Sequence, residues 1–173
     1  MTVDRIPSAS SGPGAFWRWI AVAFVVIVLD QITKHAVEAR FVYGEQLAVI
    51  PGFFNLTLAY NPGAAFSFLA DAGGWQRHFF TVLAAAVSAW IVFMLRRHHG
   101  ETRLSLALAL IMGGALGNVI DRILLGHVID FIHVYYRDWD YPAFNLADSA
   151  ICIGAALMVW DSFRSKPAPE KQA

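Results

Sequence analysis

Long uncharged apolar blocks constrain this chain more than any other feature of its sequence. Residues 79–95 and residues 104–120 each run for seventeen positions without a charged side chain. Only 15% of all residues are charged, whereas a soluble domain carries about 25%. Because a helix needs about twenty predominantly apolar residues to cross a bilayer, the sequence predicts an integral membrane protein.

Two shorter apolar segments raise the number of predicted membrane spans to four. One begins at Phe16 near the start of the chain, and the other follows Phe144 near its end. The predicted spans are residues 16–37, 76–95, 104–121 and 144–162, within a membrane domain of residues 15–163. The serine- and glycine-rich residues 1–14 are predicted to be a disordered tail, and residues 164–173 a second tail.

The charged residues that flank the spans predict how the chain crosses the membrane. The first span is expected to be retained, because Asp30-Gln31-Ile32-Thr33-Lys34 follows it instead of the small-residue cleavage site of a signal peptide. With four spans, both termini share a side with the loop between the second and third spans. That side carries eight basic residues and the other side five, which predicts cytoplasmic termini and a polar site at the extracytoplasmic face.

The segment between the first two spans is too long for a simple hairpin and has β character. Residues 41–69 are rich in Phe, Val, Thr and Tyr, with Pro51-Gly52 and Asn61-Pro62-Gly63 as turn signals. Because open strand edges are not found in lipid, we expect a small sheet at the interface, against the helix ends. The predicted fold class is an all-α membrane protein of four transmembrane helices with a small extracytoplasmic β-sheet.

Acidic residues crowd against apolar segments between residues 113 and 148, where they are energetically expensive. Asp130 and Asp148 are the best candidates for a working pair. When two carboxyl groups lie close together, one keeps its proton while the other is ionised, so the pair can hydrolyse an amide without a metal ion. The alternative is a structural role, in which these acids form ion pairs with Arg122, Arg137 or Lys34.

The other buried polar residues have simpler interpretations. Asp30 and Lys34 are four residues apart and are expected to form an ion pair on one helix face. Asp121 is expected to pair with a neighbouring base. Asn118, like Asn61 and Asn145, can both donate and accept hydrogen bonds, or can close a turn or cap a helix.

Other functional classes fit the sequence less well. His127, Asp130 and His133 have a spacing that resembles a metal site, but the histidines would diverge on a helix and the HExxH pattern is absent. A Ser–Lys dyad would need Lys34 beside Ser67 or Ser149. A proton carrier would use Asp30, Asp130 and Asp148, yet such a protein should carry polar groups near the middle of its spans. A scaffold protein would not need paired acids beside asparagine donors.

Five sequence blocks follow one another in a characteristic order. They are DQITK at residues 30–34, NPGAAF at 61–66, GNVIDR at 117–122, GHVIDF at 126–131 and FNLADS at 144–149. Any one block is a weak signal, but together, with matching spacing, they closely resemble lipoprotein signal peptidase, the type II signal peptidase of bacteria. The resemblance covers about residues 17–160.

The resemblance implies an aspartic endopeptidase of the bacterial cytoplasmic membrane, which cuts prolipoproteins just before their lipidated cysteine. It implies that Asp130, in the V-x-D-F pattern, and Asp148, in the F-N-x-A-D pattern, are the catalytic residues. The residues that it implies around the substrate are Asn61, Asn118, Arg122 and Asn145. It also implies a sheet that cradles the substrate and a short extracytoplasmic helix.

The expected partners follow from the same resemblance. They are lipidated prolipoprotein substrates, membrane lipid and inhibitors of the globomycin type. We expect no nucleic acid, no cofactor and no metal ion, and a monomeric enzyme.

Overall fold

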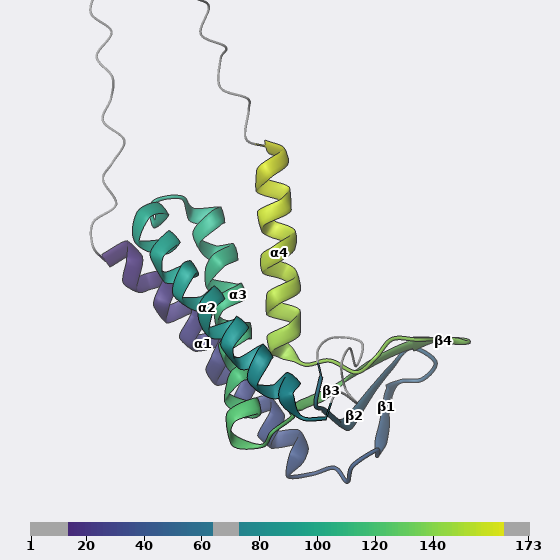
Figure 1. Cartoon of the computed structure of the whole chain (residues 1–173). Helices are drawn as coiled ribbons and strands as arrows, with labels where there is room; N and C mark the ends of the chain where they lie inside the picture. Colours follow the sequence, from purple (N-terminus) through teal and green to yellow (C-terminus); the bar gives the residue numbers. More distant parts are fainter. Residues whose placement is uncertain (1–13, 64–72, 165–173) are drawn as a thin grey trace, which may run out of the picture.

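The computed structural model describes residues 14–63 and 73–164, and these contain four helices long and apolar enough to cross a membrane. The helices are α1 (Gly14–Glu38), α2 (Trp75–His98), α3 (Thr102–Leu124) and α4 (Leu146–Arg164), as Figure 1 shows. They coincide with the four apolar blocks of the sequence. Together with a small antiparallel sheet, they confirm the predicted fold class.

Helix α3 is the centre of the helix bundle. It contacts α1, α2 and α4, and most of its apolar stretch is buried, whereas only a small part of the apolar stretch is buried in each of the other three helices. Small residues permit this close packing: a Cβ atom added at Gly113 would lie 2.7 Å from the carbonyl oxygen of Ala23 on α1. Exposed apolar surface of this extent is characteristic of helices that face lipid.

A four-stranded antiparallel sheet lies at one end of the bundle (Figure 1). Its strands are β1 (Gln46–Ile50), β2 (Phe54–Asn61), β3 (Val128–Tyr136) and β4 (Trp139–Asp140), in the order β1-β2-β3-β4. The register of β2 against β3 shifts between Leu56 and Ala59, so that Ala59 lies opposite Asp130. The sheet rests on α1 through an apolar cluster that includes Val37, Leu58 and Ile129.

The structure adds two features to the sequence expectations. Half of the sheet comes from residues 128–140, where the β-branched and aromatic run VIDFIHVYY forms β3. Helix α4 begins at Leu146 rather than at residue 144, because Phe144 is held in a β-bridge with Ile132.

Parts of three expectations fall on residues that are not described. The predicted tails lie outside the described residues, apart from Gly14 and Arg164 at the ends of α1 and α4. Residues 64–72, which include Ser67 and the end of the predicted β region 41–69, also lie outside them. The described ranges contain no short helix beyond the four long ones.

Candidate active site

The two predicted catalytic aspartates come from different elements that meet where the sheet adjoins the bundle. Asp130 lies on β3, and Asp148 lies in the first turn of α4. Figure 1 shows the start of α4 beside the sheet. Two asparagines, Asn118 on α3 and Asn145 before α4, connect the two carboxyl groups through hydrogen bonds. The sequence motifs that are separated along the chain therefore converge at one site.

Asn145 and Asp148 form a reciprocal cap at the start of α4. The backbone N–H of Asp148 donates to Oδ1 of Asn145 over 2.8 Å, and the backbone N–H of Asn145 donates to Oδ2 of Asp148 over 3.3 Å. This is the pattern of a capping box, with a carboxylate at the third helical position. The cap fixes the Asp148 carboxyl group at a helix N-terminus, where the macrodipole stabilises negative charge.

The side-chain amide of Asn145 also reaches the other aspartate. Its Nδ2 donates to Oδ1 of Asp130 over 2.7 Å and to Oδ1 of Asn118 over 3.2 Å, and the side chain is fully buried. Asn118 in turn donates from Nδ2 to Oδ1 of Asp148 over 2.8 Å. Each aspartate is therefore held by an amide donor, and the two donors are bonded to each other.

Asn61 and Arg122 complete the surroundings of the aspartates. Asn61 donates from Nδ2 to Oδ2 of Asp130 over 3.2 Å, and its Oδ1 accepts the backbone N–H of Gly63 over 3.0 Å. Arg122 is buried and donates from Nη2 to the carbonyl oxygen of Gly63 over 2.8 Å. Arg122 therefore holds a backbone carbonyl of this chain and anchors the turn that follows β2.

Burial changes the acid strength of one aspartate. Asp130 is only 2% exposed. Desolvation, and secondarily the negative charge of Asp148, raise the pKa of Asp130 to about 7, although hydrogen bonds from Asn61 and Asn145 act in the opposite direction. A carboxyl group with this pKa is half protonated at neutral pH, as an acid catalyst requires.

A buried ion cluster supports the site from the side of α1. Lys34 Nζ lies 2.8 Å from Oδ2 of Asp30 and 2.8 Å from Oδ2 of Asp121, and it also donates to Oδ1 of Asn118 over 2.8 Å. Asp30 accepts the backbone N–H of Ala147 at the start of α4. The expected pairing of Asp30 with Lys34 is present, and Lys34 is also the base that pairs with Asp121.

Sequence reasoning missed two contributions to this cluster. Gln31 donates from Nε2 to Oδ1 of Asp121 over 2.8 Å and to the carbonyl oxygen of Gly117 over 3.2 Å. Gly117 also permits the approach of α1, since a Cβ atom there would lie 2.7 Å from Oδ2 of Asp30. Both residues lie inside the five sequence blocks described above. Their place in these blocks was the sequence signal that could have indicated a role at the site.

The alternative sites receive no support from the described residues. His133 is bonded to Asp140, and within residues 14–63 and 73–164 no group of three histidine, cysteine or acidic side chains could hold a metal ion. The hydroxyl of Ser149 donates to the carbonyl oxygen of Asn145, while Lys34 is engaged by the ion cluster. Ser67 lies outside the described residues.

Two apolar cavities reach the site from the sides of α4. One, of about 420 Å³, is lined by Asp148 together with residues such as Phe144 and Ile153. The other, of about 380 Å³, lies between α2, α3 and α4 and is lined by Asn118, Arg122 and Asp148. Both cavities therefore connect the carboxyl group of Asp148 with apolar side chains of the helices around it.

Comparisons with known proteins agree on one family. A family model described as "Signal peptidase (SPase) II" matches residues 22–164. A lipoprotein signal peptidase of Chromobacterium violaceum is 59% identical over 164 residues, covering 94% of this chain and 98% of that protein. One of Neisseria meningitidis serogroup B is 53% identical over 163 residues, covering 94% and 99%.

A solved structure supports the same conclusion. It is titled as a bacterial membrane enzyme determined by the in meso method at 2.3 Å resolution, and it superposes with a TM-score of 0.79 at 31% identity. The match covers 90% of this chain and 93% of that one. Four membrane-crossing helices, the family model and these relatives lead to one conclusion: the chain is a multi-pass membrane protein that belongs to the signal peptidase II family.

Proposed function

We propose that this protein is an aspartic endopeptidase that removes signal peptides from lipidated prolipoproteins. Membership of the signal peptidase II family supports peptidase activity on prolipoproteins. The proposed mechanism is that water activated between Asp130 and Asp148 cleaves the peptide bond just before the lipidated cysteine. The observation that carries it is the pair of carboxyl groups held by bonded amides, one of them with a pKa of about 7.

The environments of the two aspartates suggest different roles. Asp148, at the N-terminus of α4, is the ionised base that takes a proton from water, and the water oxygen attacks the scissile carbonyl carbon. Asp130, protonated in its buried position, gives its proton to the carbonyl oxygen. When the tetrahedral intermediate collapses, the leaving nitrogen takes the proton held by Asp148, and Asp130 recovers its own. The pair is then ready for a second turnover.

The substrate and the cavities have matching polarity. A signal peptide is an apolar helix and a lipidated cysteine carries acyl chains, whereas the two cavities that reach Asp148 are mainly apolar. We propose that these cavities receive the apolar parts of the substrate from the membrane. The active site then lies at the extracytoplasmic face of the bacterial cytoplasmic membrane, with both termini in the cytoplasm and the enzyme acting as a monomer.

Cleavage of a lipidated prolipoprotein peptide by the purified protein in lipid vesicles tests this proposal. Asp130→Asn and Asp148→Asn should each reduce turnover by several orders of magnitude, because each removes one proton-transfer group. Asp161→Asn, at the opposite end of α4, is the matched control and should leave turnover unchanged. If Asp130→Asn or Asp148→Asn cleaves at the wild-type rate, the dyad mechanism is wrong. Inhibition by a globomycin-type cyclic peptide is expected for the wild type.

A further inference from the structure

Three exposed arginines lie at the end of the helix bundle that is opposite the sheet. Arg18 is near the start of α1, and Arg96 and Arg97 are in the last turn of α2. Figure 1 shows the start of α1 and the turn between α2 and α3 at the end of the bundle away from the sheet. Among the residues that the structure describes, none of the three arginines forms an ion pair with an acidic side chain. The proposed mechanism does not use them.

Aromatic rings hold two of these arginines at the contact between α1 and α2. The Cζ atom of Arg18 lies 4.5 Å from the centroid of the Trp19 ring, and that of Arg96 lies 5.8 Å from the centroid of the Phe16 ring. Trp19 is buried, and its Nε1 donates to the carbonyl oxygen of His99, just after α2, over 3.0 Å. A guanidinium group that lies over a ring keeps the N–H groups at its edge for another acceptor.

The acidic side chains that the structure describes at this end lie on its other side. Glu101 and Asp161 line one small pocket beside α3 and α4, together with Arg103. Arg103 lies 3.9 Å from Asp161 and so offsets part of their negative charge. The side formed by α1 and α2 therefore carries the uncompensated positive charge of this end, and it favours an anionic ligand.

Exposed apolar side chains flank the arginines. Trp17, next to Arg18, is 65% exposed, and Phe93, on α2, is 48% exposed. The Cζ atom of Arg97 lies 4.3 Å from the centroid of the Phe93 ring. Because indole rings prefer the membrane interface, these guanidinium groups are at the level of the lipid headgroups. The planar fork of arginine matches the oxygens of a phosphate, so the complementary ligand has a phosphate head and apolar chains.

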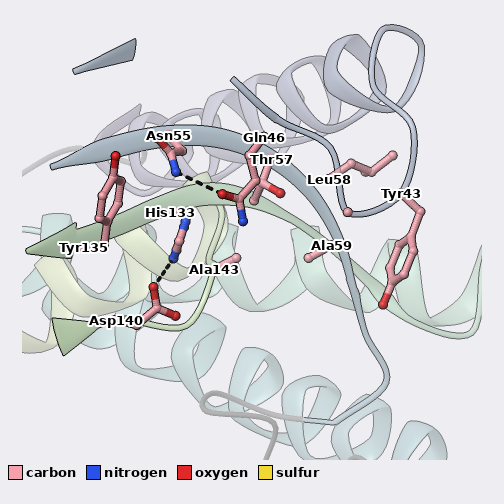
Figure 2. Close-up of a pocket in the computed structure, with 11 residues that line it drawn as sticks. Tyr43, Gln46, Asn55, Thr57, Leu58, Ala59, His133, Tyr135, Asp140 and Ala143 are labelled. Carbon is pink, nitrogen blue, oxygen red and sulfur yellow. Dashed lines mark hydrogen bonds and ion pairs between the residues drawn. The ribbon is translucent and has the colours of Figure 1, made fainter. Parts of the chain in front are cut away.

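The sheet end of the molecule has different chemistry. A cavity of about 550 Å³ on the sheet is lined by Asp140, and Figure 2 shows this acid paired with His133. Arg137 also lies over a ring, that of Tyr136, but Asp138 follows it directly in the chain. It is a single exposed arginine with an acid beside it, and it serves as a control for the three arginines at the other end.

We propose that the surface formed by Arg18, Arg96 and Arg97 binds the phosphate headgroup of an anionic membrane lipid. The phosphate oxygens accept hydrogen bonds from Arg18 and Arg96 across the contact of α1 with α2, and the acyl chains lie along exposed apolar side chains such as Trp17. The orientation proposed above puts this surface at the cytoplasmic leaflet, where anionic lipids make the membrane surface negative. The positive-inside rule accounts for basic residues at this end but needs only their charge, whereas a headgroup site also needs their geometry.

Native mass spectrometry of the delipidated full chain in a neutral detergent tests the proposal. The chain is titrated with phosphatidylglycerol or with phosphatidylcholine of the same acyl chains. The wild type should bind phosphatidylglycerol about tenfold more tightly, and this lipid should raise its Tm, because a ligand of the folded state stabilises it. Arg18→Gln/Arg96→Gln should weaken the binding of phosphatidylglycerol about tenfold to thirtyfold, since each basic side chain near an anionic membrane surface contributes about fivefold.

Two further variants separate the geometry of the site from its charge. Arg18→Lys/Arg96→Lys keeps both charges and loses the planar forks, so it should weaken the binding of phosphatidylglycerol about threefold, the effect of one lost hydrogen bond. Arg137→Gln, the matched control at the sheet end, should bind this lipid as the wild type does. The replaced side chains are exposed, so every variant should keep the Tm of the wild type in detergent alone.

Equal affinity of the wild type for the two lipids would overturn the proposal, and this comparison needs no variant to fold. Wild-type affinity for phosphatidylglycerol in Arg18→Gln/Arg96→Gln, or a loss in Arg137→Gln as large as in that double variant, would contradict the location of the site. Wild-type affinity in Arg18→Lys/Arg96→Lys would show that charge alone suffices. Release of the bound lipid by inorganic phosphate at the same concentration would assign the arginines to a free anion and not to a membrane lipid.

Discussion

Removal of the buried ammonium group of Lys34 is the most informative perturbation of the support behind the aspartates. The Lys34 side chain is 0% exposed and contacts Asp30 and Asp121, whose side chains are 0% and 3% exposed. Lys34→Met keeps most of the side-chain volume and removes the charge. It leaves two buried carboxyl groups without their shared cation, and Asn118 without one of its two donors.

The magnitude follows from the burial. Breaking a buried ion pair by removing one partner costs about 3–5 kcal/mol, and here one cation serves two acids. A protein of this size is stable by about 5–15 kcal/mol, so Lys34→Met should lose a large part of its free energy of unfolding. Turnover should fall as well, because Lys34 holds Oδ1 of Asn118 and so orients Nδ2 towards Asp148.

Denaturant unfolding in detergent micelles, monitored by tryptophan fluorescence, measures the first effect. Arg103→Met is the matched control: its ion pair with Asp161 spans 3.9 Å, with side chains 62% and 31% exposed, and should contribute less than about 1 kcal/mol. The double variant Lys34→Met/Asp121→Asn also neutralises the acid. Its loss in free energy of unfolding should be about 1–3 kcal/mol smaller than the sum of the losses in the two single variants. If Lys34→Met is destabilised no more than Arg103→Met, the ion cluster does not support the site and the reasoning fails.

Three further variants or conditions test other parts of the site. Because the pKa of Asp130 is raised from 3.8 to about 7, kcat/KM should fall as the pH rises through about 7. The contribution of protonated Asp130 to the free energy of unfolding should be complete below pH 3.8 and lost as the pH rises to about 7. The free energy of unfolding of Asp130→Asn should lack this pH dependence. Gly117→Ala should lower the free energy of unfolding by about 1–3 kcal/mol and reduce turnover by displacing Asp30. Gly14→Ala, whose added Cβ atom would have no neighbour within 4 Å, should do neither. Asn145→Ala should lower stability by about 1 kcal/mol through loss of the cap, and a kcat equal to that of the wild type would contradict its role in holding the aspartates.

Local sequence patterns predicted the features of this fold that depend on neighbouring residues. The four helices follow from uninterrupted apolar blocks, because a bilayer imposes a minimum length on any span. The ion pair of Asp30 with Lys34 follows from a spacing of four residues on one helix. The strand β3 was missed, although residues 128–136 are rich in β-branched and aromatic side chains, because its partner β2 lies far away in the sequence.

Contacts between residues far apart in the sequence could not be predicted from local sequence patterns. The bond from Lys34 to Asn118 joins residues 84 positions apart, and the bond from Asp30 to the backbone of Ala147 joins residues 117 positions apart. No periodicity within a single segment contains such information. The five sequence blocks indicated which residues gather at the site, but the amide that holds each aspartate is visible only in the folded chain.

The two aspartates of this site have the same side chain, and the fold makes them different. Asp148 is at the third position of a helix, where the capping box and the helix N-terminus both stabilise a negative charge. Asp130 is on a strand, 2% exposed, and burial raises its pKa to about 7. The F-N-x-A-D block produces the first environment because its asparagine is the helix cap. The V-x-D-F block produces the second because its aspartate lies within an apolar strand. The division into base and acid that we propose therefore follows from the secondary structure that each block forms.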